Sequence, residues 1–93
     1  MKYVIKYTGQ FKRDMRLCQR RGYDMELLYK VISLLAETGN LPAEYRPHQL
    51  HGNRKGQWEC HIQSDWLLIW NQYDNELELL MLNTGTHSDL YNK

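Results

Sequence analysis

The alternation of apolar and polar positions in the first part of the chain predicts one strand followed by two helices. Residues 2–8 alternate with a period of two, which is typical of a β-strand. Across residues 10–21 apolar side chains recur at helical spacing, beginning with Phe11. Residues 25–38 carry a wider apolar stripe. Because Gly22 separates these two segments, we expect an antiparallel helical hairpin.

After this hairpin the pattern changes to a long loop followed by short strands. Residues 39–56 show no periodicity and contain both prolines. A loop of this length in a small domain is usually functional. Three strands are then expected over residues 57–62, 66–72 and 76–83. Residues 66–70 are apolar on both faces, which places that strand centrally. Residues 84–91 favour a short final helix or turn.

The length and composition indicate one domain over residues 1–93. A chain of 93 residues cannot bury two separate cores, and 42% hydrophobic with 25% charged residues is typical of a globular protein. We therefore expect an α+β fold. Its antiparallel or mixed sheet would have about four strands, with the helical hairpin packed on one face and the other face partly open.

Cellular placement follows from what the sequence lacks. The longest apolar run, residues 66–70, is far shorter than a bilayer crossing requires, and the first residues do not resemble a signal peptide. The only two cysteines, Cys18 and Cys60, stand at positions predicted to be buried, which makes a disulfide framework improbable. We expect a cytoplasmic protein without a membrane association.

The net charge of +1 conceals a strong asymmetry between the two ends of the chain. Residues 1–21 hold seven Lys/Arg against Asp14 alone, which gives 7 − 1 = +6. Residues 59–93 hold one Lys against six acids, which gives 1 − 6 = −5. A cationic stripe on the first helix is a candidate contact for an acidic protein or for RNA, or is simply a solvated face. Its members are Lys12, Arg16, Arg20 and Arg21.

Several groups capable of acid–base chemistry are expected near one rim of the sheet. Alternation over residues 57–62 puts Glu59 and His61 on the same face, and Asp65 ends that strand. The remaining candidates are His48, His51, Arg54 and Lys55 in the long loop and His87 after the last strand. Histidine has an unperturbed pKa of about 6.5 and can accept or donate protons, while a cation can stabilise phosphoryl oxygens. This inventory suits metal-free RNA cleavage through the ribose 2′-hydroxyl.

Two other interpretations use the same residues. His48 and His51 with Cys60–His61 or His87 could hold zinc, although the paired Cys-x-x-Cys spacing of a structural site is absent. The tyrosines, tryptophans and basic stripe could instead form a passive RNA-binding platform. Exposed histidines in a small domain are also commonly idle.

A series of motifs in fixed order then points to a known family. They are Pro47-His48-x-Leu50-x-Gly52, Lys55-Gly56, Glu59-Cys60-His61-Ile62-x-x-Asp65-Trp66-Leu67-Leu68-Ile69 and Thr84-Gly85-Thr86-His87-Ser88-x-Leu90-Tyr91. With the opening at residues 7–14, this pattern resembles the YafQ branch of the RelE-type bacterial toxins over nearly the whole chain. The resemblance implies a RelE-like fold and the toxin half of a type II toxin-antitoxin pair. It also implies ribosome-dependent endoribonuclease activity on mRNA, without a metal or cofactor, and an antitoxin partner like RelB or DinJ.

Carried over position by position, the resemblance implies a catalytic set of His48, His61, Asp65 and His87. His87 would be the general acid, His61 the base and Asp65 the residue that orients it, while His48 would contact substrate or phosphate. Further substrate contacts are expected from Arg54, Lys55, Glu59, Asn83 and Tyr91.

Two departures from the family pattern concern positive charge. Relatives often carry arginine where this chain has Asn83, and they tend to read Trp-Lys-Gly-x-Arg where this chain reads Arg-Lys-Gly-Gln-Trp over residues 54–58. Loss of one preorganised donor costs about 10² to 10³ in rate. The alternative function is therefore an attenuated or inactive relative that only binds antitoxin or RNA.

Overall fold

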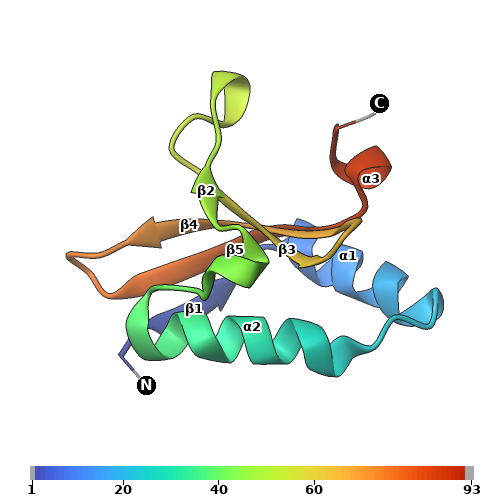
Figure 1. Ribbon diagram of the computed structural model, residues 1–93, viewed down its shortest axis with the longest axis horizontal. Coiled ribbons are helices and arrows are strands. Elements are labelled where there is room, and N and C mark those ends of the chain that lie inside the picture. Colours follow the sequence, from blue (N-terminus) through green and yellow to red (C-terminus); the bar gives the residue numbers. More distant parts are fainter. Residues whose placement is uncertain (1, 92–93) are drawn as a thin grey trace.

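The computed structural model describes residues 2–91, which form a five-stranded mixed sheet with two long helices on one face (Figure 1). The strands are β1 (Val4–Tyr7), β2 (His48–Gln49), β3 (Trp58–Gln63), β4 (Trp66–Tyr73) and β5 (Glu78–Gly85). The helices are α1 (Gly9–Arg20), α2 (Met25–Thr38) and α3 (His87–Tyr91), with 3₁₀ turns η1 (Ala43–Tyr45) and η2 (Gly52–Arg54). The sheet order is β1-β5-β4-β3-β2, in which only the β1–β5 pair is parallel.

The α+β class and the helical hairpin are confirmed. The sheet has five strands, one more than the four that were expected. The additional strand β2 lies inside the segment that showed no periodicity, and it pairs antiparallel with β3 through His48 opposite Glu59. Two residues are too few to produce a readable alternation, which is why the sequence pattern missed this strand. The last strand also starts later than expected, at Glu78, because the turn extends to Leu77 with its positive φ of 51°.

Local capping explains where the two long helices begin and end. The Thr8 side chain accepts a hydrogen bond from the Phe11 amide (3.0 Å), and Asp24 accepts one from Glu26 (3.2 Å). Helix α2 ends at Gly39, whose φ of 76° is left-handed. A Cβ at Gly39 would lie 2.6 Å from the Tyr3 hydroxyl, so glycine also permits the close packing of strand β1.

The central strand β4 separates two apolar layers, as its sequence predicted. Trp66, Leu68 and Trp70 join the main core with α1 and α2, whereas Leu67 and Ile69 join a smaller cluster on the opposite face. That smaller cluster also contains Leu50, Leu82 and Leu90. The loop carrying η2 and helix α3 stand on this second face (Figure 1), so the face expected to be partly open is covered in part by these two segments.

The cysteines are free and buried, which agrees with the prediction against a disulfide framework. Burial is the main cause that raises the pKa of the Cys18 thiol to about 11 and that of Cys60 to about 12. Both side chains therefore pack as neutral thiols. None of the helices between residues 2 and 91 combines the length and apolarity of a membrane span.

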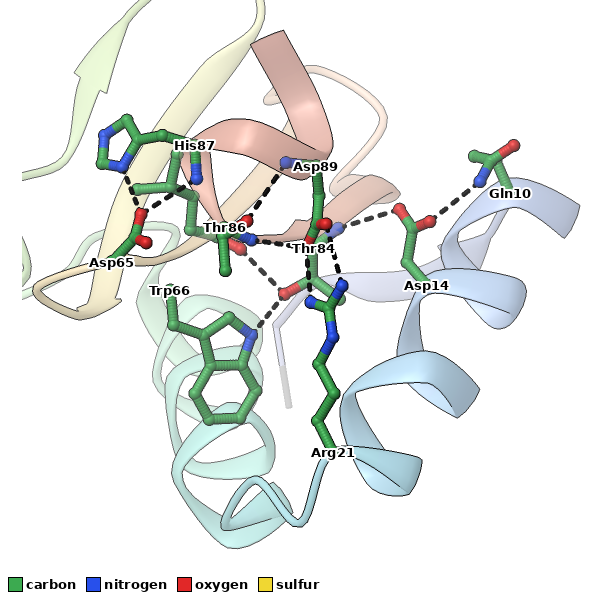
Figure 2. A network of polar contacts seen from close by, with 10 residues as sticks. Gln10, Asp14, Arg21, Asp65, Trp66, Thr84, Thr86, His87 and Asp89 are labelled. Carbon is green, nitrogen blue, oxygen red and sulfur yellow. Dashed lines mark hydrogen bonds and ion pairs between the residues drawn. The ribbon is translucent and has the colours of Figure 1, made fainter. Parts of the chain in front are cut away.

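A buried hydroxyl links the central strand to β5. The Trp66 indole N–H donates to Thr84 Oγ1 (2.9 Å), and the same hydroxyl donates to the Leu67 carbonyl (2.8 Å). Figure 2 shows this contact beneath the start of α3. We predict that Thr84→Val, which keeps the volume but leaves the indole N–H unpaired, lowers the free energy of unfolding by about 1–3 kcal/mol.

The control for this prediction is Thr84→Ser, which retains the hydroxyl and loses one buried methyl group, at a cost of about 1 kcal/mol. Both values would come from urea unfolding followed by tryptophan fluorescence. A serine variant less stable than the valine variant would contradict the assignment.

Candidate active site

Three histidine rings from separate parts of the chain meet at one rim of the sheet. His48 comes from β2, His61 from β3 and His87 from the first position of α3. The ring centroids of His48 and His61 are 6.4 Å apart, and those of His61 and His87 are 5.9 Å apart. His61 therefore lies between the other two, and the expected convergence of these residues is confirmed.

Asp65 holds His87 through two hydrogen bonds. Asp65 Oδ1 lies 2.5 Å from His87 Nδ1 and 2.9 Å from the His87 backbone nitrogen (Figure 2). The backbone N–H, followed by the ring contact, lowers the pKa of Asp65 below its ordinary value. Because an ionised carboxylate only accepts, Nδ1 carries the proton and Nε2 is directed away from the carboxylate.

This pairing corrects the role expected for Asp65. Asp65 was expected to orient His61, since the two residues lie near the same end of β3. The structure instead places its carboxylate on His87, and His61 Nδ1 lies 3.4 Å from the Ser64 carbonyl oxygen. The short turn between β3 and β4 directs Asp65 toward α3, which sequence spacing alone could not reveal.

A buried carboxylate anchors the other end of the cluster. Glu59 is only 5% exposed, its Oε1 lies 3.2 Å from His48 Nε2, and its Oε2 accepts a hydrogen bond from the Tyr91 hydroxyl. Burial and this bond raise the pKa of Tyr91 above its ordinary value, so the phenol stays protonated. His48 Nδ1 lies 2.8 Å from the Arg46 carbonyl oxygen, and a cationic His48 can donate to both acceptors.

Of the expected substrate-contact residues, Arg54 lies near the cluster and Asn83 does not. The Arg54 guanidinium carbon is 5.9 Å from the centre of the Tyr91 ring, and its Nη1 donates to Gln57 Oε1 (2.8 Å). Asn83 Nδ2 instead contacts Asp14 of α1 (3.3 Å). Lys55 is exposed.

A cavity of about 350 Å³ lies beside Tyr91, on the side of Arg54. It is lined by Leu50, His51, Asn53, Arg54, Leu90 and Tyr91. His51 therefore faces this cavity at the start of η2 instead of joining the three rings.

The cationic stripe of Lys12, Arg16, Arg20 and Arg21 is exposed at all four positions, as expected. Arg21 differs from the other three because its guanidinium donates to both oxygens of Asp89 in α3, at 2.6 and 3.0 Å. This bond holds the pKa of Asp89 well below its usual range. Arg21 is therefore engaged within the chain and is not free for a partner.

The residue set suggested for zinc does not come together. Cys60 is fully buried in the main core, on the opposite face of β3 from His61. Within residues 2–91 there is no group of three or more His, Cys, Asp or Glu side chains arranged to hold a metal ion.

The sequence did not indicate two of the contacts around the site. Glu59 was expected as a substrate contact, yet it joins β2, β3 and α3 through His48 and Tyr91. The pair between Arg21 and Asp89 was not anticipated either. The sequence carried a signal only for the contact between Asp89 and Thr86, which have the spacing of a helix-capping box, and none for Arg21 as the partner.

Fold and site together define a small α+β protein with an acid–base histidine site at the edge of a mixed sheet. Residues 3–92 match the family described as bacterial toxin of type II toxin-antitoxin system, YafQ. The chain is 40% identical to the mRNA interferase toxin YafQ of Escherichia coli K12 over 88 residues, which cover 94% of each chain. The chain therefore belongs to the YafQ family of type II toxins.

Solved structures agree with this assignment. The crystal structure of YafQ from E. coli BL21(DE3) matches with a TM-score of 0.88 and 38% identity, covering 96% of this chain and 98% of that one. The E. coli DinJ-YafQ complex matches with a TM-score of 0.87 and 38% identity, with the same coverage. The RelE-like fold expected from the motifs is thereby confirmed.

The depressed pKa of Asp65 predicts how acid affects stability. A carboxyl whose pKa is lower in the folded state stabilises the fold above its unfolded value of about 3.9, and this contribution is lost as the pH falls through the folded value. We expect Asp65→Ala to lower Tm at pH 7, and the difference from the wild type to close below about pH 4. Thermal unfolding followed by circular dichroism between pH 2 and pH 7 measures this.

Ser64→Ala, in the same turn, serves as the control and should shift Tm equally at every pH. If the wild-type and Asp65→Ala curves stay parallel down to pH 2, the Asp65–His87 contact does not exist in solution.

Proposed function

We propose that this chain is an mRNA interferase, an endoribonuclease that cleaves messenger RNA on the ribosome and so inhibits translation. The observation that carries this proposal is the row of three histidine rings whose two outer members, His48 and His87, are each paired with a carboxylate. The name of the E. coli relative, mRNA interferase toxin, supports the same activity. Since mRNA and ribosomes are cytoplasmic, we place the protein there.

The proposed reaction begins with the ribose 2′-hydroxyl. His61, the central ring, accepts the hydroxyl proton while the 2′-oxygen attacks the adjacent phosphorus. The bond from phosphorus to the 5′-oxygen of the next nucleotide then breaks, and His87 Nε2 donates a proton to that oxygen. The products are a 2′,3′-cyclic phosphate and a free 5′-hydroxyl, and the proton balance needs only protein side chains.

The surroundings of His87 suit the role of proton donor. Asp65 accepts a hydrogen bond from Nδ1–H and so fixes the orientation of the ring, which leaves Nε2 as the nitrogen that donates. The His87 ring is half exposed, at 54% of its side chain, so Nε2 is accessible to a bound phosphodiester. His48 lies on the other side of His61, and both of its ring nitrogens are engaged, by Glu59 and by the Arg46 carbonyl. We therefore assign it an electrostatic role, in which a cationic His48 attracts a phosphoryl oxygen without a direct hydrogen bond.

Arg54 is proposed to supply the positive charge that the family arginine would have provided at position 83. It lies beside Tyr91 and is held by Gln57, whereas Asn83 is turned toward Asp14. A guanidinium near the phosphorane would stabilise its negative charge. We therefore favour an active ribonuclease over an attenuated protein that only binds antitoxin or RNA.

The proposed partner is a cognate antitoxin of the RelB or DinJ kind. The structure of an E. coli relative was solved as a DinJ-YafQ complex. The exposed residues Lys12, Arg16 and Arg20 on α1 present positive charge to an acidic antitoxin segment or to ribosomal RNA. Either contact would weaken with salt.

The proton-donor role is tested with His87→Ala. We expect mRNA cleavage on purified ribosomes to fall about 10²- to 10⁴-fold, because the 5′-oxygen then leaves without a proton. Primer extension that maps new 5′ ends measures the rate. Ser88→Ala, the exposed neighbour in α3, should cleave like the wild type, and undiminished cleavage by His87→Ala would reject the assignment.

The role of Arg54 is tested with Arg54→Gln, which should lower the cleavage rate about 10²- to 10³-fold. Adding Asn83→Arg to that variant should recover part of the loss, since it places a guanidinium at the family position. Lys55→Gln removes the neighbouring charge and should cost less. Equal losses from the two loop substitutions would indicate general attraction of RNA instead of a specific contact.

A further inference from the structure

Helix α3 carries two groups of the site but is too short to hold its own orientation. It spans five residues, and isolated helices of that length are unstable in water. His87 stands at its beginning and Tyr91 at its end. The direction of both side chains therefore depends on what anchors this helix to the rest of the fold.

One anchor is a charged contact from the opposite layer of the molecule. Arg21 follows the last residue of α1, and its guanidinium binds Asp89 through two hydrogen bonds of 2.6 and 3.0 Å. The side chains are 34% and 24% exposed, so the pair is more shielded than an open surface pair. A bidentate contact of this kind sets direction as well as distance.

Asp89, held by Arg21, also binds the residue that precedes α3. Its Oδ2 also accepts the Thr86 backbone N–H (2.9 Å), and its own N–H donates to Thr86 Oγ1 (3.1 Å). A Cβ at Gly85 would lie 2.7 Å from the same carboxylate, so glycine allows Asp89 to approach the strand end. Thr86 directly precedes His87, so the carboxylate that Arg21 holds also caps the turn that aims the His87 ring (Figure 2).

We propose that Arg21 is a positioning residue, which acts through Asp89 and Thr86 to hold His87 against Asp65. This inference rests on the proposed function for its effect on cleavage. Arg21 lies outside the row of histidines, and both of its terminal guanidinium nitrogens donate to Asp89. It therefore acts through Asp89. The residue also neutralises Asp89, which would otherwise repel a phosphodiester approaching His87.

The test compares Arg21→Gln, Asp89→Asn and the double variant in single-turnover cleavage on ribosomes. We expect each single variant to lower the maximal rate about 10- to 100-fold, since misplacement of about 1 Å can cost 10² in rate. The ribosome concentration at half-maximal rate should stay unchanged. The double variant should lose no more than either single one, because both remove the same contact.

Arg13→Gln is the matched control, since it removes an arginine of α1 whose side chain makes its one hydrogen bond within the described residues to Gln10. It should retain the maximal rate. Arg21→Lys keeps the charge but only one donor direction, and should fall between wild type and Arg21→Gln. If circular dichroism shows that Arg21→Gln does not fold, the maximal rates of Arg21→Lys and Asp89→Asn are compared with the wild-type rate instead.

A second readout does not depend on cleavage. Long-range ¹H–¹⁵N spectra of the imidazoles report whether His87 Nδ1 keeps its proton on Asp65. We expect this signature in the wild type and in Arg13→Gln, and its loss in Arg21→Gln and Asp89→Asn. If the wild type does not cleave RNA, the proposed function fails, and the spectra alone decide the positioning role.

Three results would overturn the inference. One is a wild-type maximal rate in both single variants, and another is an unchanged His87 signature in them. The third is a raised half-maximal ribosome concentration with an unchanged maximal rate, which would make Arg21 an RNA contact, as its place in the cationic stripe first suggested.

Discussion

Strand β4 buries side chains on both of its faces, and the positions of the other elements follow from that constraint. Trp66, Leu68 and Trp70 require the cover of α1 and α2, while Leu67 and Ile69 require cover on the other side. That second cover is supplied by Leu50 of the loop and Leu90 of α3. The need to bury the second face therefore brings the loop and the final helix, and with them His48 and His87, to the same rim.

The site itself is built from two pairs of an imidazole and a carboxylate on either side of a less constrained ring. Asp65 holds His87, and Glu59 holds His48. The carboxylates differ in their surroundings, because Asp65 is exposed and Glu59 is buried. In the proposed reaction, this arrangement leaves His61 as the base, with the proton donor and the phosphate contact held in place at its two sides.

Much of the fold could be predicted because its signals are local. The apolar spacing of α1 and α2, the break between them at Gly22, and the doubly apolar β4 each depend on neighbours in sequence. The two-residue strand β2 could not be predicted, since its pairing with β3 comes from contacts across the sheet. The same limit applies to side-chain partners such as Tyr91 with Glu59, which are separated by more than 30 residues.

The sequence by itself determined the class of fold, the family and which residue types gather at the rim. These depend on periodicity and on ordered motifs, both of which are properties of the chain read in one dimension. Only the tertiary structure decided which carboxylate serves which histidine, that Asn83 faces Asp14, and that Arg21 is bound to Asp89. Hydrogen bonds and ion pairs act over about 3 Å, so their partners are defined only once the backbone has placed distant segments side by side.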